Sequence, residues 1–374
     1  MVNFSVFSSN PHKTKGRVYK IAKDKFRNDY QRDVGRIIHS TAFRRLKYKT
    51  QVFVNHEGDH FRTRLTHTLE VSQIARSISR YFKLNEDLTE AIALAHDLGH
   101  TPFGHAGEDA LIKASGSYFN HNDQSFRIIT FLEKVYLPFD GLNLTWETLE
   151  GIAKHNGPLK NINENSTLFS FNKNIMDLEL KTFPPLEAQV ASISDDIAYM
   201  NHDLDDGFRA GLFNPRDLNK LSFYKEIIKE YGIEADSDRF KKELVRKLIN
   251  KMVIDLIKQI ETNLNKIKPK NVNDIRNAGF NIASFSNKMK RNIFQIRLFL
   301  NKRMYNHKTV TNKTKKYKKI IENLYQLYVS NKLTIPTKWI NETYKDIKVD
   351  KKQIIIDYIS GMTDRYILKI CNKI

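Results

Sequence analysis

Apolar residues recur three and four positions apart along almost the whole chain, and this helical period is the feature that most limits what it can fold into. Strand patterns are nearly absent, and residues 51–54 are the best short candidate. The sequence therefore predicts an all-α protein. Helices are expected at about residues 30–47, 63–82, 85–97, 104–115, 120–133, 145–155, 185–206, 217–231, 236–265 and 284–306, with shorter helices from there to the carboxyl end. Residues 156–180, rich in Asn and Ser, are expected to form a polar loop or flap.

The chain carries no pattern typical of export or of a membrane anchor. Its amino-terminal residues lack a basic start followed by an apolar core, and no run of about 18 apolar residues occurs. A single cysteine, Cys371, cannot form an intramolecular disulfide. We therefore expect a cytoplasmic protein with no membrane partner.

The charge balance is strongly basic, since 62 Lys and Arg against 42 Asp and Glu give a formal net charge of +20. Such an excess favours polyanionic ligands, either nucleotides or single-stranded nucleic acid. The densest run lies within residues 302–319 and includes Lys313, Lys315, Lys316, Lys318 and Lys319. A solvated helix face in a lysine-rich chain explains this run equally well.

A dense polar cluster follows an apolar run within residues 91–105. The apolar run predicts the last buried turns of a helix, and Gly99 and Pro102 then turn the chain. His96 and Asp97 would therefore lie at the inner end of a buried helix, where imidazole nitrogen and carboxylate oxygen can bind a divalent cation. Taken alone, a His-Asp pair is more often part of a surface turn, because two-residue motifs recur by chance.

Two further features favour the metal site. His67 lies in the first turns of an expected helix upstream. Downstream, Asp195, Tyr199 and Asp203 follow one another at steps of four, so they share one helical stripe that drifts by only about 40° per step. A His, then a His-Asp pair, then a distant Asp is the ligand order of the HD superfamily of metal-dependent phosphohydrolases, which this region resembles.

The resemblance can be narrowed to one family, the bacterial deoxyguanosinetriphosphate triphosphohydrolase-like proteins. The segments that carry it are residues 32–53, 55–67, 95–105 and 194–199. The likeness covers about residues 29–211 and, more thinly, residues 297–305. It implies an enzyme with a helical HD-domain core that cleaves a deoxynucleoside triphosphate, such as dGTP, to deoxynucleoside and inorganic triphosphate.

On this basis we divide the chain at residue 215. Residues 1–215 would form the HD-domain catalytic core, and residues 216–374 a helical carboxyl-terminal region that completes the substrate site and contributes oligomer contacts. No Gly/Ser-rich or Pro-rich linker separates the two parts. The family also implies a homo-oligomer, often a hexamer.

The family motif implies His67, His96, Asp97 and Asp195 as the metal ligands. Asp195 is preferred to Asp196 because the family ligand stands four before a tyrosine and eight before a sugar-binding aspartate, as Asp195 does in this chain. Two neutral imidazoles and two carboxylates would leave a divalent ion Lewis-acidic. Mn²⁺ or Mg²⁺ is expected, with Fe, Co, Ni or Zn as alternatives.

The same resemblance assigns the other site residues. Three histidines, His100, His105 and His121, would surround the scissile phosphate. They would transfer protons, because imidazoles titrate near neutrality, and His121 is the first choice. Asn122 stands where related enzymes can carry a glutamate. The implied substrate contacts are Arg64 and Arg297 for the phosphates, Gln51 and Asp203 for the deoxyribose, Tyr199 beneath the sugar, and Tyr305 against C2′.

Two other functions stay open at this point. One is an HD phosphohydrolase acting on a nucleoside monophosphate, a cyclic nucleotide or an alarmone; the other is a nucleic-acid-binding protein whose metal site is incidental or nucleolytic. Arg64, Arg297 and the Gln51–Asp203 pair favour a triphosphate that carries a sugar. The chain also lacks zinc-finger spacing and an RNA-recognition aromatic motif. The preferred base, the native metal and any activation by dNTPs or DNA are not specified by the sequence.

Overall fold

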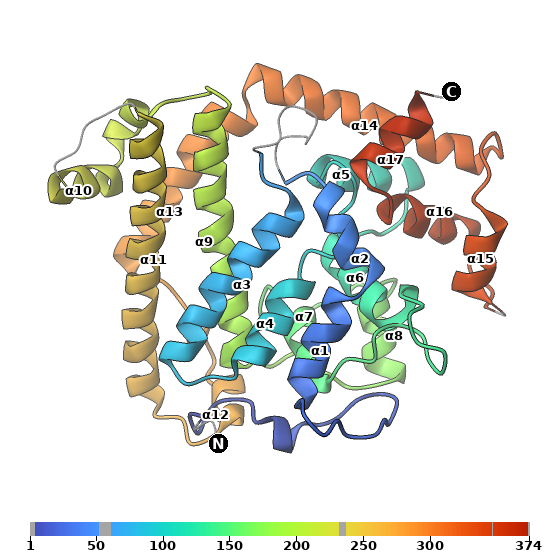
Figure 1. Cartoon of the computed structure of the whole chain (residues 1–374), viewed down its shortest axis with the longest axis horizontal. Helices are drawn as coiled ribbons and strands as arrows, with labels where there is room; N and C mark the ends of the chain where they lie inside the picture. The colour runs from blue at the N-terminus through green and yellow to red at the C-terminus, as the bar shows by residue number, and fades with distance from the viewer. Residues whose placement is uncertain (1–3, 52–60, 232–236, 346, 373–374) are drawn as a thin grey trace.

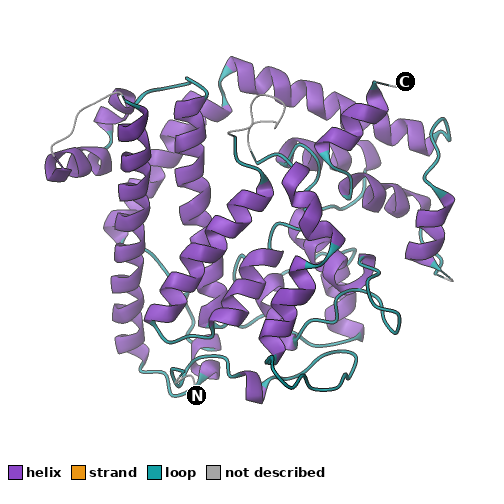
Figure 2. Ribbon diagram, viewed as in Figure 1, coloured by secondary structure: helices purple, strands orange, loops and turns teal. Residues whose placement is uncertain are grey.

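Helices form the regular structure of the chain (Figures 1 and 2). The computed structural model describes residues 4–51, 61–231, 237–345 and 347–372. The α-helices are α1 (Asp29–Ile38), α2 (Thr41–Arg45), α3 (Arg64–Tyr81), α4 (Glu86–Ala95), α5 (His105–Ser115), α6 (His121–Arg127), α7 (Trp146–Ala153), α8 (Thr167–Asn174), α9 (Leu186–Arg209), α10 (Ser222–Tyr231), α11 (Asp238–Ile267), α12 (Val272–Arg276), α13 (Asn287–Leu300), α14 (Lys308–Val329), α15 (Thr337–Tyr344), α16 (Lys351–Ser360) and α17 (Asp364–Cys371). The shorter segments are the 3-10 helices η1 (Pro11–Lys13), η2 (Leu46–Tyr48) and η5 (Pro215–Lys220) and the π-helical turns η4 (Ile128–Leu132) and η6 (Asn301–Tyr305).

The all-α prediction is confirmed. Within the described ranges no strand forms, and extended pairing is limited to two isolated bridges, Arg17 with Thr145 and Thr50 with Thr63. The expected strand at residues 51–54 falls almost wholly outside these ranges. No helix in the described part of the chain combines the length and the apolar character needed to cross a bilayer.

The largest core surrounds α9, which packs against α3, α4, α11 and α13. Figure 1 shows α9 lying between α3 and α11. Apolar residues such as Val190, Ile197 and Leu204 are almost completely buried along it. Because much of α9 is enclosed by other helices, the carboxylates on its buried faces must find partners inside the protein.

The last helices of the chain, from α14 onward, cover another part of the molecule. Helix α14 lies along α5 and also packs on α16 (Figure 1). Their shared core contains Leu111 of α5, Ile321 and Leu324 of α14, and Ile356 of α16. The two halves of the chain are therefore joined by apolar packing, and the division at residue 215 stays a prediction.

Four expected elements differ from the structure. The helix expected at residues 217–231 is interrupted at Leu221, whose extended backbone separates η5 from α10. The helix expected at residues 30–47 is broken, because Ser40 takes an extended conformation and its hydroxyl caps α2 by accepting from the Phe43 N–H at 3.1 Å. The polar loop expected at residues 156–180 contains α8, whose first N–H groups are held by the Asp123 carboxylate. The expected short helices after residue 306 include α14, which spans 22 residues.

Candidate active site

Three helices that pack on one another bring the four expected ligands together. His67 comes from α3, His96 caps the carboxyl end of α4 and Asp97 follows it, and Asp195 comes from α9. These helices pack on one another in pairs, which fixes the relative positions of the side chains. His67, His96 and Asp97 are buried, whereas 27% of the Asp195 side chain is exposed.

The distances within this group suit a single cation. His67 Nε2 lies 2.9 Å from Asp195 Oδ1, and His96 Nε2 lies 3.6 Å from the same oxygen and 3.4 Å from Asp97 Oδ1. Ligand atoms of His67, His96 and Asp97 all lie within 4.8 Å of one another. Nitrogen and oxygen donors of this kind bind divalent transition metals and Mg²⁺.

His96 supplies the test of whether these residues fit a metal. Its Nδ1 donates to the Ala93 carbonyl at 2.7 Å, which leaves Nε2 buried and without a hydrogen-bond partner among the described residues. Burial opposes protonation of His96, but Asp97 and Asp195 outweigh it and raise the pKa of His96 to about 9. The carboxylates of Asp97 and Asp195 therefore favour a positive charge beside His96 Nε2, and a metal ion would supply that charge in place of a proton. The residues fit a divalent cation.

Arg64 lies directly behind the ligands. It is 3% exposed and its Nη1 donates to Asp97 Oδ2 at 3.0 Å. The other oxygen of Asp97 is 3.1 Å from His100 Nε2. Although burial opposes ionisation, Arg64, His96 and His100 hold the pKa of Asp97 well below its usual range. Asp97 thus stays a carboxylate and links the ligands to the histidines beyond.

The three expected catalytic histidines gather in a second cluster with Glu108. His105 opens α5, Glu108 follows one turn later, and His121 opens α6. The rings of His100 and His121 are stacked with centroids 4.1 Å apart. Glu108 accepts from His105 Nδ1 at 3.2 Å and from His121 Nδ1 at 3.0 Å. Glu108 was absent from the sequence prediction, although its spacing of three from His105 is a signal that could have found it.

Two further histidines touch the ligands and were also absent from the sequence prediction. His202 Nδ1 lies 3.1 Å from His67 Nδ1, and its Nε2 lies 3.0 Å from the Glu70 carboxylate. His202 stands seven residues after Asp195, two helical turns along the same face, so spacing could have found it. His155 Nε2 lies 3.6 Å from Asp195 Oδ2, and nothing in its local sequence signals that contact.

The residues expected at the sugar lie farther along α9. Tyr305, at the end of η6, donates to the Asp203 carboxylate, and the Tyr305 and Tyr199 hydroxyls also interact. Burial raises the pKa of Asp203 to about 8, although the Tyr305 hydrogen bond opposes that shift. Gln51 is buried, and its Oε1 has no hydrogen-bond partner in the described part of the chain.

Asp196 and Arg297 stand apart from the buried ligands. They form an ion pair of 2.7 Å in which both side chains are more than half exposed. The carboxylate next to Asp195 therefore has a different partner and a different environment. The structure does not bring Arg297 into the buried cluster formed by the other expected residues.

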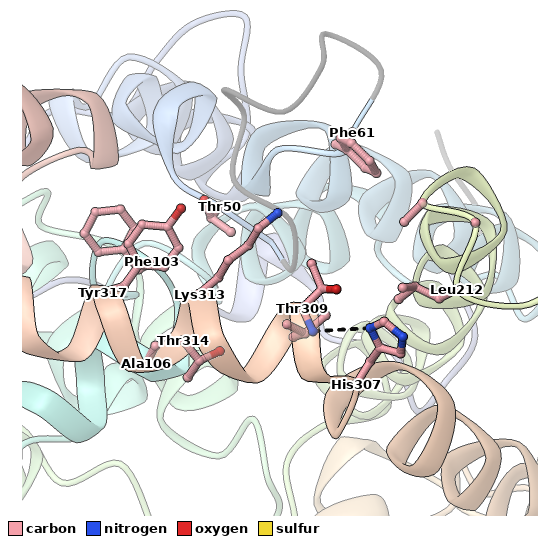
Figure 3. A pocket seen from close by; sticks show the side chains of 13 residues that line it. Thr50, Phe61, Phe103, Ala106, Leu212, His307, Thr309, Lys313, Thr314 and Tyr317 are labelled. Carbon is pink, nitrogen blue, oxygen red and sulfur yellow. Dashed lines mark hydrogen bonds between the residues drawn. The ribbon is translucent and has the colours of Figure 1, made fainter.

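A cavity of about 380 Å³ lies beyond the sugar residues, between the end of α9 and α14 (Figure 3). Phe103 and Tyr317 stack on one side of it with centroids 4.4 Å apart. Lys313, His307 and Leu212 also line it, and Figure 3 shows the Lys313 side chain extending away from α14. The cavity therefore offers a flat aromatic wall together with polar groups.

Comparison with known proteins identifies the family. Residues 64–200 match the HD domain and residues 283–373 match the phosphohydrolase-associated domain. The chain is 46% identical to the deoxyguanosinetriphosphate triphosphohydrolase-like protein of Rickettsia rickettsii (strain Iowa), over 98% of this chain and 97% of that protein. It is also 46% identical to the protein of the same name from Bartonella henselae, over 98% and 94% of the two chains. The chain therefore belongs to the deoxyguanosinetriphosphate triphosphohydrolase-like family of HD-domain hydrolases.

Proposed function

We propose that this hydrolase cleaves deoxynucleoside triphosphates to deoxynucleoside and inorganic triphosphate with the help of a divalent cation, Mn²⁺ or Mg²⁺. The order of groups along α9 carries the proposal. Asp195 belongs to the ligand cluster, Asp203 to the sugar group eight residues later, and Ala210 lines the cavity. At about 1.5 Å per residue, these points follow one another over roughly 22 Å. Phosphate, sugar and base follow one another in the same order in a nucleotide.

The ligand cluster would hold the cation and the phosphates. His67, His96, Asp97 and Asp195 would bind the ion, which would supply Lewis-acid polarisation of a phosphate oxygen and activation of water. Arg64 adds a fixed positive charge beside this centre, because its guanidinium is buried against Asp97. Charge on the triphosphate would therefore meet cationic groups on two sides.

The histidine cluster would move the protons. Glu108 accepts from His121 Nδ1, so His121 Nε2 is the nitrogen that faces other groups. We propose that His121 gives a proton to the leaving 5′-oxygen and that His105 or His100 orients the attacking water. Hydrolysis at the α-phosphorus needs both events, and an imidazole can both donate and accept a proton.

The sugar group and the cavity would select the nucleoside. Asp203 and Gln51 would bind the 3′-hydroxyl, Tyr199 would pack beneath the ring, and Tyr305 would crowd C2′ and so exclude a ribose. The base would enter the cavity beside Phe103 and Tyr317. The stacked rings of these two residues favour a flat ligand.

We propose that dGTP is among the substrates. The relatives carry deoxyguanosinetriphosphate in their names. Lys313 lines the cavity, and an ammonium only donates hydrogen bonds, whereas O6 and N7 of guanine accept them. Homo-oligomerisation and binding of single-stranded nucleic acid remain predictions from the sequence.

One experiment tests the reaction. The protein is incubated with Mn²⁺ and each of the four dNTPs in ¹⁸O-labelled water, and the products are identified by phosphorus NMR and mass spectrometry. We expect free triphosphate that carries the label, because attack at the α-phosphorus breaks the P–O5′ bond. Pyrophosphate with a nucleoside monophosphate, or orthophosphate with a diphosphate, would refute the proposal.

A further inference from the structure

We propose that His155 is a positioning residue of the metal centre, which acts by fixing the orientation of the Asp195 carboxylate. This inference rests on the proposed metal centre, but not on the identity of the nucleotide. His155 belongs neither to the ligand set nor to the histidine cluster around Glu108. Three observations carry it: the anchoring of its backbone, its contacts with two ligands, and the surroundings of its second ring nitrogen.

The backbone of His155 is anchored by a buried charged network. His155 follows Lys154, the capping residue of α7. Lys154 is completely buried, and its Nζ donates to Glu150 and to Thr182, each at 2.8 Å. Arg276 makes a two-bond ion pair with the same Glu150 carboxylate, at 2.9 and 2.7 Å. Because the residue before His155 is fixed by this network, the His155 imidazole starts from a defined backbone position.

The imidazole approaches the oxygen of Asp195 that does not face His67. Asp195 Oδ1 faces His67 Nε2 at 2.9 Å, whereas Asp195 Oδ2 faces His155 Nε2 at 3.6 Å. The His155 ring also stacks on His96, with centroids 5.3 Å apart and planes 16° apart. This contact would restrain rotation of the carboxylate at one oxygen, while the other oxygen faces His67 and His96. Groups that orient ligands in this way commonly tune metal affinity.

The second ring nitrogen separates this role from that of an ordinary core histidine. His155 Nδ1 is buried and has no hydrogen-bond partner among the described residues. Among the described residues, the Asp195 carboxylate is thus the polar group that faces a ring nitrogen of His155. A carboxylate in this position favours the tautomer of His155 with a proton on Nε2. On its other side, His155 lines a polar cavity of about 220 Å³.

Binding of Mn²⁺ to the metal-stripped full chain tests the inference without any nucleotide. Electron paramagnetic resonance of unbound Mn²⁺ gives the Kd. His155→Ala and His155→Asn should weaken binding by about 10-fold to 100-fold, because neither places an N–H where Nε2 lies. His155→Gln should stay within a few-fold of the wild type, since its amide nitrogen stands at the same bond distance from the backbone as Nε2. His39→Ala, a change of an exposed histidine at the end of α1, is the control and should have no effect.

Kinetics give a second readout. In His155→Asn, kcat at low Mn²⁺ should fall and recover as Mn²⁺ is raised, whereas KM for the nucleotide should stay unchanged. Unchanged Mn²⁺ affinity in His155→Asn would overturn the inference, and so would a His155→Gln variant as weak as His155→Asn. Circular dichroism shows whether each variant keeps its helices. Absence of Mn²⁺ binding in the wild type would refute the metal centre itself, whereas weakened binding without any dNTP cleavage would refute only the proposed substrate.

Discussion

Two adjacent carboxylates at the centre of α9, those of Asp195 and Asp196, have different surroundings. Asp195 faces His67, His96 and His155, whereas Asp196 pairs with Arg297 at the surface. Adjacent residues on a helix point about 100° apart, so only one of the two can face the ligands. Their chemistry is the same, and the direction of the side chain gives them different partners.

Asp195→Ala should therefore abolish metal binding, and Asp196→Ala should not. Loss of Asp195 leaves two imidazoles and one carboxylate, so we expect Mn²⁺ affinity to fall by more than about 100-fold and hydrolysis to disappear. Asp196→Ala should keep the affinity within a few-fold, because it removes only an exposed ion pair, which is worth about 1 kcal/mol or less. Elemental analysis after dialysis measures the bound metal. A full metal content in Asp195→Ala would contradict the ligand assignment.

Asp203 should make the stability of the metal-free protein fall as the pH rises. Burial raises the pKa of Asp203 to about 8, against a usual value near 3.8, so the folded state binds the proton more tightly than the unfolded state. Stability from this group is complete below about pH 4 and is lost as the pH rises to about 8. Asp203→Asn keeps an acceptor for Tyr305 and removes the titration.

Urea unfolding in EDTA at pH 5 and pH 8 measures this effect. Relative to the wild type, Asp203→Asn should gain about 1 to 3 kcal/mol between these two pH values, since one pKa unit corresponds to about 1.4 kcal/mol. Asp238→Asn is the control, because 91% of that side chain is exposed. A wild type whose stability changes with pH in the same way as that of Asp203→Asn would show that Asp203 is ionised throughout.

At the scale of residues, the order of the expected ligands could be predicted, because it follows from the spacing of motif residues along the sequence. His67, the His96-Asp97 pair and Asp195 stand in the order that the family resemblance requires, and the structure places them together. His155 could not be predicted, since its contact with Asp195 exists only after α7 has packed beside α9. The spacing of residues within one segment does not predict contacts that form when two helices pack together.

At the scale of elements, capping chemistry explains which helix boundaries were predictable. Thr63 and Asn120 cap α3 and α6 with side-chain oxygens, and both helices begin where the sequence predicts. Ser40 also caps a helix, but the amphipathic pattern continues across it, so the break between α1 and α2 was missed. Helix α8 was missed because polar composition hid the two apolar residues that it buries, Leu168 and Phe171.

Gly99 should be essential to the junction between the two side-chain clusters. A Cβ there would lie 2.1 Å from the backbone nitrogen of Ser125 and 2.2 Å from the carbonyl oxygen of His121. Both atoms belong to the backbone of α6, so the whole helix would have to move and His121 would move with it. We expect Gly99→Ala to lower the free energy of unfolding by about 1 to 3 kcal/mol and to reduce kcat.

Gly35 provides a matched control within α1. A Cβ there meets nothing closer than 3.9 Å, so Gly35→Ala should stabilise the helix by up to about 1 kcal/mol. Urea unfolding gives both values, and steady-state kinetics gives kcat. Equal effects of the two substitutions would show that the packing of α6 against Gly99 is not a constraint.

At the scale of the whole molecule, the carboxyl-terminal helices are tied to the active site by buried polar contacts. Lys49 is buried and donates to the carbonyl groups of His100 and Ser360. Asp364, at the start of α17, accepts from the N–H groups of Thr50 at 2.9 Å and Phe103 at 3.0 Å. The sequence predicted that this region completes the site, but it could not predict the contacts of Ser360 and Asp364, because each joins residues more than 250 positions apart.

The net charge of +20 also belongs to this scale. The structure divides the lysines of α14: Lys318 pairs with Asp109 at 2.7 Å and Lys313 lines the cavity. The other three, Lys315, Lys316 and Lys319, are exposed together on one surface. If that surface binds single-stranded DNA, its lysines must neutralise phosphates and release counterions.

Substitution of these three lysines by glutamine should then weaken binding of a labelled oligonucleotide and flatten its dependence on salt. Each contact contributes a slope of about 0.7 in log K against log salt, so loss of all three should reduce the slope by about 2. Lys20, Lys23 and Lys25 are also exposed, and their change to glutamine removes the same charge from another surface. Fluorescence anisotropy between low and physiological salt measures both variants. Equal losses in the two variants would mean that the oligonucleotide responds to net charge alone, and a specific loss in the α14 variant would locate the nucleic-acid surface on α14.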